Sequence, residues 1–470
     1  MQQSSAGIPT ATTVAIAGGG LAGLAAGCAL ADAGFRVTLF ERRPYLGGRA
    51  SSYQHPGTGE VVDNCQHVLF GCCTNLIEFY RRIGVEGSIR WSDTMTFIEP
   101  GGRMSVLKAT ALPAPLHTTP SFFAFPFLSL RDKLAIARAM AVLMPAPLLD
   151  TKESFFDWLQ RHRQTNNAIE RFWKPILVSA LSEDLDKVSV AYAAQVVRES
   201  MKAPSARQMG IPSIPLTDLY HAADAYIRAR GGDLRLRTGV ESFRPQTSRV
   251  GVAANGQEEI FDHLVLAVPF DVLSKLLPDS RESAPLAEKL SHFETSPITG
   301  IHLWFDRQIS DLDHAVLLDR TIQWMFHKSR LLRTRENQEG GSYVELVVSS
   351  SKSLIEKTRG EIIELATNEV REFFPEARAA NLVKATVVKE LNATYSPRPG
   401  IDEYRPKTET VWPRVFLAGD FTATGWPATM EGAVRSGYLA AGALVGAATG
   451  NNSSLLVPDL PPSGLMKLFR

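Results

Sequence analysis

Three glycines at the spacing Gly-x-Gly-x-x-Gly are the first residues in this chain that could do chemistry. Gly18, Gly20 and Gly23 follow the apolar run 12–17 and precede small residues that continue to Ala33. In a strand, turn and helix of this kind, the first glycine permits the turn, the second lets the backbone approach a pyrophosphate, and the third lets the helix lie close to the strand. The helix N-terminus then offers unpaired N–H groups to the phosphates. This order predicts a dinucleotide site.

An acidic residue ends the next predicted strand, 36–40. Glu41 stands there, about where a ribose 2′-hydroxyl needs an acceptor, and its charge would repel the 2′-phosphate of NADP. A second glycine pair and a fixed cation follow, which is more than a nicotinamide site requires because they permit a second close approach to a phosphate. The further residues assigned to the cofactor on these grounds are Arg42, Gly47, Gly48 and Arg49.

The glycine loop, the acid and Gly-Gly-Arg together resemble the flavin-containing amine oxidase and phytoene desaturase superfamily. The resemblance recurs near the other end, where the strand-like run 414–418 leads into Gly419 and Asp420. In that superfamily the Gly-Asp pair lies on the phosphate and ribityl chain of FAD. The resemblance implies non-covalent FAD, because neither a Cys nor a His stands where a flavin linkage would be sought.

Two more segments match the cofactor site of that superfamily. A predicted helix opens with Met430 and Glu431, and its amide end would face an anionic reduced flavin ring. The backbone at Val240 would contact the adenine. The implied fold class is α/β, with a discontinuous Rossmann-like FAD-binding domain and an inserted mixed α+β substrate domain. The predicted FAD-binding segments are 1–100, 215–285 and 400–450; the substrate segments are 101–214, mainly helical, and 286–399; 451–470 is a tail.

Motifs outside the nucleotide site narrow the resemblance. They are Asp63-Asn64-Cys65-Gln66-His67, Phe172-Trp173-Lys174-Pro175, Ser296-Pro297-Ile298, Ala393–Gly400 and Thr424–Gly432. With these motifs the chain is similar, from about Val14 to Ala447, to the squalene-associated FAD-dependent desaturases, identified as hydroxysqualene dehydroxylases of bacterial hopanoid synthesis. The departures from that pattern are Cys65 in place of glycine, Lys174 in place of an acid, and Ser182 in place of asparagine.

The resemblance implies reduction of hydroxysqualene, an allylic alcohol, to squalene by a hydride from reduced flavin and a proton. His67 is the candidate proton donor, because imidazole titrates near neutral pH and Asp63 or Gln66 could orient it. The alternative for His67 is a structural hydrogen bond. Glu431 is the second catalytic candidate, and it could instead position the flavin ring or cap a helix. Aromatic rings that could line the pocket and stabilise a cation, or simply pack in the core, belong to Trp173, Trp304, Tyr395 and Trp426.

Three other functions stay open on the sequence. A carotenoid desaturase shares the fold, the flavin and a long apolar tunnel. An amine oxidase would bring a polar cleft and commonly a lysine near the flavin, whereas the predicted strand 297–305 contains no lysine. A flavoprotein without catalysis is the third. Because no second glycine motif of comparable quality appears, electrons would come from an external donor, either NAD(P)H or a redox protein.

Composition restricts the partners. Fifty Lys and Arg against 49 Asp and Glu give a net charge of +1 over 470 residues, so no summed field would hold nucleic acid. The four cysteines lack the spacing of a zinc site, which predicts free thiols and no metal. Residues 1–13 do not resemble a signal peptide, so we expect a cytoplasmic protein. Because a long hydrocarbon partitions into bilayers, we also expect peripheral contact with the inner face of the cell membrane, through 122–128 and the helix 130–144 beside it. The other interpretation of 122–128 is core, or a loop under a helix.

Overall fold

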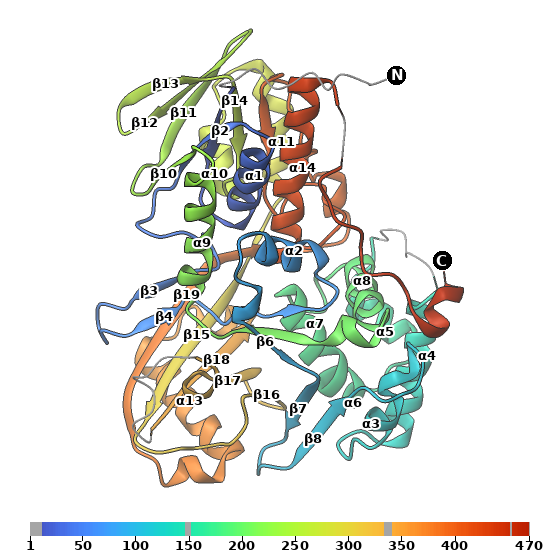
Figure 1. The fold of residues 1–470 in the computed structure, drawn as a ribbon. Helices are drawn as coiled ribbons and strands as arrows, with labels where there is room; N and C mark the ends of the chain where they lie inside the picture. The colour runs from blue at the N-terminus through green and yellow to red at the C-terminus, as the bar shows by residue number, and fades with distance from the viewer. Residues whose placement is uncertain (1–11, 146–151, 333–340, 452–453, 470) are drawn as a thin grey trace.

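A parallel five-stranded sheet forms the centre of the upper half of the molecule in Figure 1. The computed structural model describes residues 12–145, 152–332, 341–451 and 454–469. The strand order is β10 (Asp233–Arg235), β2 (Arg36–Phe40), β1 (Thr13–Ala17), β14 (His263–Leu266) and β20 (Val415–Leu417). Neighbouring strands pair in parallel throughout. Three distant stretches of the chain therefore build one sheet of the doubly wound kind.

Two helices rich in small residues pack against each other beside this sheet. They are α1 (Leu21–Asp32) and α14 (Met430–Thr449), from opposite ends of the chain (Figure 1). A Cβ on Gly437 would lie 2.3 Å from the carbonyl oxygen of Ala22, so glycine is what allows this close approach. The apolar run 14–31 is thus a strand and a buried helix. Among the described residues, no helix is long and apolar enough to cross a membrane.

Further elements surround the nucleotide-binding sheet. Figure 1 shows an antiparallel three-stranded sheet beside it, and short strands and helices below. These elements are α2 (Thr74–Arg82), α9 (Leu216–Arg228), α10 (Phe270–Leu276), α11 (Ala284–Ser291), β3 (Ser52–Gln54), β4 (Val61–Asp63), β5 (Leu69–Phe70), β6 (Ile89–Ser92), β9 (Met209–Pro212), β11 (Val240–Pro245), β12 (Val250–Ala254) and β13 (Gln257–Phe261).

A seven-stranded sheet organises the lower half (Figure 1). Its order is β19 (Leu382–Tyr395), β15 (Thr295–Phe305), β18 (Ser342–Ser349), β17 (Trp324–His327), β16 (His314–Leu317), β7 (Thr94–Ile98) and β8 (Met104–Lys108). Helix α13 (Arg359–Phe373) packs on it, and the short helix α12 (Lys328–Leu331) follows β17. The α/β fold class with a mixed second region is confirmed, while the predicted domain bounds stay a prediction.

A group of helices lies beside the seven-stranded sheet, on the right in Figure 1. They are α3 (Thr119–Phe123), α4 (Leu130–Leu143), α5 (Phe155–Arg161), α6 (Asn166–Ala168), a π-helical turn (Ile169–Trp173), α7 (Lys174–Leu181) and α8 (Val190–Met201), with a last short helix at Gly464–Leu468. Ser182 ends α7 with φ +53°, a left-handed position that asparagine tolerates well. Lys174 forms an exposed ion pair with Glu170. Cys65 has no positive φ, so a side chain fits there without backbone strain.

Candidate functional site

The glycine turn between β1 and α1 gives each glycine a different environment. Gly18 has φ +108°, and a Cβ there would lie 2.5 Å from the Ala267 carbonyl oxygen. A Cβ on Gly23 would lie 1.9 Å from the Gly18 carbonyl oxygen. Gly20 instead has φ −78°, and a Cβ there meets no atom closer than 3.8 Å. The fold therefore requires glycine at the first and third positions, whereas the second fits the close approach of a pyrophosphate.

Glu41 ties the glycine turn to the segment that follows β2. Its buried carboxylate accepts hydrogen bonds from the backbone N–H groups of Gly19 and Arg43, each at 2.7 Å. Each carboxylate oxygen has a second lone pair, so a ribose hydroxyl can still bind there. The Arg43 guanidinium donates to the Gly48 carbonyl at 2.7 Å, a role that sequence reasoning missed. Its neighbour Arg42 is exposed.

The second glycine pair lies directly against the first glycine turn. Gly47 donates its backbone N–H to the Gly19 carbonyl at 2.9 Å. A Cβ on Gly48 would lie 3.0 Å from the Cα of Gly20. Two glycine turns that are separate in sequence thus form one surface of exposed backbone, and this surface suits two linked phosphates.

An ion pair joins the two ends of the chain. An Arg49 guanidinium nitrogen lies 2.5 Å from a carboxylate oxygen of Asp420. Gly419 has φ +145°, and its N–H donates to the Ser436 hydroxyl at 2.8 Å on α14. The Gly-Arg and Gly-Asp motifs, which the resemblance assigned to the same cofactor, are therefore in direct contact.

One cavity of about 960 Å³ runs past these motifs and into the lower half of the molecule. Gly23 is not part of its lining, because it lies beneath the turn. The predicted cofactor residues that line it are Gly18, Gly20, Glu41, Arg42, Gly47, Gly48, Arg49, Val240, Gly419, Asp420, Met430 and Glu431. The backbone cradle, the ribose acceptor and the N-terminus of α14 fit a flavin dinucleotide. No group of acidic, His or Cys residues in the described ranges could hold a metal ion.

The other end of the cavity is apolar. Its wall comes from β7, the helices α3, α4 and α7, and the C-terminal helix 464–468. The larger side chains there include Phe97, Leu107, Phe122, Ile136, Met140 and Phe172. A wall of this composition favours a long hydrocarbon over a polar or charged substrate.

His67 lines the same cavity. Its Nδ1 lies 2.7 Å from the Cys65 carbonyl oxygen, so Nδ1 carries the proton and Nε2 is left as an acceptor. Burial lowers the pKa of His67, although the hydrogen bond to Cys65 raises it in part. The imidazole is therefore neutral at pH 7. This state suits a proton acceptor, whereas the sequence suggested a proton donor.

Glu431 lines the cavity, but its carboxylate binds another helix. It accepts hydrogen bonds from the N–H groups of Asn75 at 3.2 Å and Leu76 at 2.7 Å, and from the Asn75 amide at 3.0 Å. These N–H groups belong to the first turn of α2, so Glu431 caps that helix. Thr429 caps its own helix, α14. The geometry supports a structural role for Glu431 and not the catalytic one.

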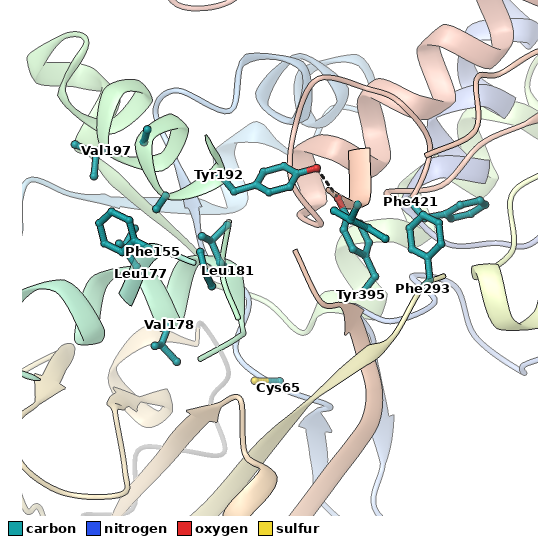
Figure 2. Packing of buried hydrophobic residues seen from close by; sticks show 14 of the residues in the cluster. Cys65, Phe155, Leu177, Val178, Leu181, Tyr192, Val197, Phe293, Tyr395 and Phe421 are labelled. Atoms are coloured by element: carbon teal, nitrogen blue, oxygen red, sulfur yellow. Dashed lines mark hydrogen bonds between the residues drawn. The ribbon is translucent and has the colours of Figure 1, made fainter. Parts of the chain in front are cut away.

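The four aromatic candidates fall into two pairs. Trp173 and Trp426 line the cavity. Trp304 and Tyr395 lie outside its lining. The Trp304 ring stacks on Tyr343 with centroids 4.4 Å apart. Tyr395 is fully buried, with its hydroxyl facing Tyr192 (Figure 2). Trp304 lies on the same face of β15 as the cavity-lining Ile298 but farther along the strand, and Tyr395 packs among other rings. Their positions therefore do not support substrate contact.

Comparisons with known proteins agree with this geometry. A family model described as flavin containing amine oxidoreductase matches residues 21–445. The chain is 27% identical to a 15-cis-phytoene desaturase of Synechococcus elongatus, over 92% of this chain and 95% of that protein. It is 26% identical to a zeta-carotene desaturase of Synechocystis sp., over 92% of this chain and 97% of that protein.

Solved structures give the same fold at lower identity. An oxidoreductase from Methanosarcina mazei has a TM-score of 0.70 at 18% identity, covering 91% of this chain and 98% of that one. A putrescine oxidase bound to putrescine has a TM-score of 0.68 at 17% identity, and the match covers 92% of this chain and 98% of that one. Because the family model spans most of the sequence, from the start of α1 into α14, the chain belongs to the flavin-containing amine oxidoreductase family.

Proposed function

We propose that this chain is an FAD-dependent oxidoreductase that desaturates a long isoprenoid hydrocarbon. The observation that carries the proposal is the single cavity with a dinucleotide-binding end and an apolar end. The relatives named phytoene and zeta-carotene desaturases, at 26–27% identity over nearly their whole length, support desaturation. FAD is the dinucleotide of choice, because the chain belongs to a flavin-containing family. The second glycine pair and the Arg49–Asp420 contact would provide the additional contacts to its phosphates and ribityl chain.

The chain's own residues would bind and orient the two molecules. Gly20 and Gly48 would admit the pyrophosphate, Glu41 would accept from the ribose, and α14 would face the ring. Bound flavin supplies hydride transfer. The apolar wall excludes water from the reacting carbons. Turnover requires an external electron acceptor, or a donor if the reaction runs in the reducing direction.

His67 would take the proton. Desaturation removes a hydride from one carbon and a proton from its neighbour, so the site needs a base near the flavin. The neutral imidazole offers Nε2 as that acceptor, since Nδ1 is held by the Cys65 carbonyl.

Reduction of hydroxysqualene to squalene is the second candidate. It is favoured by the position of two of the motifs that carry the closer resemblance, because Asn64–His67 and Trp426–Glu431 both line the cavity. This reaction needs a protonated group to assist departure of water. The lowered pKa of His67 makes that state costly at neutral pH, which is why desaturation ranks first.

Anaerobic mixing distinguishes the two reactions. We expect oxidised holoprotein to lose its flavin absorbance on addition of phytoene or zeta-carotene and to form a longer polyene. Dithionite-reduced holoprotein should stay reduced with hydroxysqualene. The opposite pair of results, with squalene formed, would establish the second candidate. If neither substrate changes the flavin and apolar isoprenoids do not bind, the proposal is wrong.

Exposed apolar side chains surround the apolar end of the cavity, where we propose contact with a bilayer. The expected contact run 122–128 is divided between core and surface. Phe125, Phe127 and Leu128 are buried, and the two phenylalanine rings pack against other aromatic rings. Phe123, Ala124 and Pro126 are exposed. The exposed apolar residues near the cavity are Leu116, Phe123, Leu130, Leu134, Leu465 and Leu468.

Replacing part of this surface should weaken membrane binding. We expect Leu134→Ser with Leu468→Ser to lower the fraction of protein that floats with liposomes at least several-fold, because each removes an apolar side chain that would enter the interface. High salt should release little of the wild type, since the net charge is only +1. Val383→Ser with Leu391→Ser, which changes exposed residues on β19, is the matched control. An equal loss of liposome binding in both double variants would exclude a specific membrane-contact surface at this end of the cavity.

A further inference from the structure

A lysine that sequence reasoning missed lies buried behind the cavity wall. Lys328, at the start of α12, donates from Nζ to Asp63 at 2.6 Å and to the Gln66 side-chain oxygen at 2.8 Å. Its Nζ is 3.3 Å from a carboxylate oxygen of Glu345 on β18. Lys328, Asp63 and Glu345 do not line the cavity, whereas Gln66 does. The available sequence signal was a charged residue directly after the buried strand β17.

Asp63 connects this lysine to the nucleotide-binding half. One carboxylate oxygen accepts from the Ser52 hydroxyl at 2.7 Å and from the N–H of Leu216 at 3.2 Å. Leu216 is the first residue of α9, so Asp63 caps that helix. The other carboxylate oxygen binds Lys328. The contact therefore joins α9 to the seven-stranded sheet.

The residues after Asp63 are held from both sides. We call Asp63–His67 the wall turn. On the cofactor side, the Asn64 amide donates to the Arg49 carbonyl at 2.8 Å, and Arg49 pairs with Asp420. On the substrate side, Lys328 binds Gln66, and the Gln66 amide donates to the His67 carbonyl at 3.1 Å.

We propose that Lys328 is a positioning residue, which fixes the wall turn against the seven-stranded sheet and thereby sets where His67 stands in the cavity. The catalytic part of this inference rests on the proposed function, whereas the ordering of the wall turn does not. Lys328 acts through Asp63 and Gln66, because its ammonium does not reach the cavity itself.

The charged groups around Lys328 fit one buried ion pair, that of Lys328 with Asp63, beside a protonated Glu345. Burial opposes ionisation of Asp63, but the nearby Lys328 ammonium lowers its pKa. Burial raises the pKa of Glu345 to about 8, and Asp63 adds to the effect while Lys328 opposes it. His302, opposite Glu345 on β15, has its pKa lowered by burial to about 3. Tyr343 on β18 donates to or accepts from His302 and stays neutral because burial raises its pKa.

Hydrogen exchange of the apoprotein tests the ordering role without substrate or flavin. Lys328→Met should raise the exchange rate of amides 64–67 by about tenfold or more, because the turn loses two of its hydrogen bonds. Lys384→Met, on β19, removes an ion pair with Glu60. It is the matched control and should leave the exchange of this peptide unchanged. Unchanged exchange in Lys328→Met would overturn the proposal.

A double variant separates positioning from charge balance. Lys328→Met leaves a buried carboxylate unpaired and could unfold the protein, whereas Asp63→Asn with Lys328→Met removes both charges and should fold. We expect the double variant to bind FAD, to keep fast exchange at 64–67, and to show a lower kcat with little change in KM. Recovery of both slow exchange and wild-type kcat would show that Lys328 only balances Asp63. If wild type proves inactive on every isoprenoid, the exchange data still decide the inference.

The pH dependence of stability gives a second readout. Below pH 4.5 Glu345 is protonated in both the folded and the unfolded chain. Above pH 4.5 the unfolded chain releases this proton, whereas the folded chain keeps it until about pH 8. Stability from this group is therefore lost as pH rises between these values. The melting temperature of Glu345→Gln minus that of wild type should increase as pH rises through that window. Above about pH 8 the difference should stay constant. A constant difference across the window would show that Glu345 is ionised beside Lys328 and would contradict the single ion pair.

Discussion

Gly20→Val is expected to yield folded protein without FAD. The backbone at Gly20 has φ −78° and no atom within 3.8 Å of an added Cβ, so the fold accepts a side chain. That side chain would occupy the place where the pyrophosphate approaches. The flavin-to-protein ratio should fall from near one to below about one tenth. Absorbance of the purified protein measures it, and circular dichroism checks the fold.

Two comparisons make this result specific. Gly360→Val, in the first turn of α13, also adds a side chain where no atom lies within 4 Å and should keep its flavin. Acid precipitation of the wild type should release FAD into a yellow supernatant, since the attachment is non-covalent. Stoichiometric FAD in Gly20→Val would refute the assignment of the glycine turn to the pyrophosphate.

His67→Ala should lower kcat/KM by about 10²–10⁴-fold with its FAD content intact, the usual cost of losing a positioned proton acceptor. As a base, His67 works when neutral, so wild-type activity should fall as pH drops through its pKa, which burial places below the usual value. The variant should lack this acidic limb. Steady-state rates over a pH series measure both effects.

The exposed His221 provides the control, because it lies on α9 outside the cavity lining. His221→Ala should behave as wild type at every pH. A loss of activity in wild type as pH rises, rather than falls, would identify His67 as a proton donor. A decrease of less than about fivefold in His67→Ala, with flavin retained, would return His67 to a structural role.

The cofactor end could be predicted from sequence because backbone geometry determines it. Gly18 needs positive φ and Gly23 needs helix–strand contact, and both requirements are visible as spacing. The side-chain roles were harder to predict. Glu431 stands at a helix start, but the helix it caps is α2, whose position beside α14 is a tertiary contact. No local pattern carries that information.

The same dependence on tertiary contacts explains why the side chains of the substrate end could not be placed from sequence. Trp304 and Tyr395 were chosen by residue type, but whether they reach the cavity depends on their position along the long strands β15 and β19 and on the rings that pack against them. The apolar run 122–128 left both core and surface open, and the structure divides it, with Phe125 and Phe127 stacked in the core and Phe123 exposed. Lys328 gave little signal, since its partners Asp63 and Glu345 come from distant strands.

The contact between α1 and α14 has a consequence for biosynthesis. Helix α1 is nearly all buried, but its packing partner α14 and the edge strand β20 are translated only after the whole seven-stranded sheet. During translation the apolar surface of α1 therefore stays without its packing partner until α14 has been made. We expect a nascent chain that lacks residues after 414 to be held by chaperones and to take up no FAD. Cofactor loading would then follow the synthesis of α14.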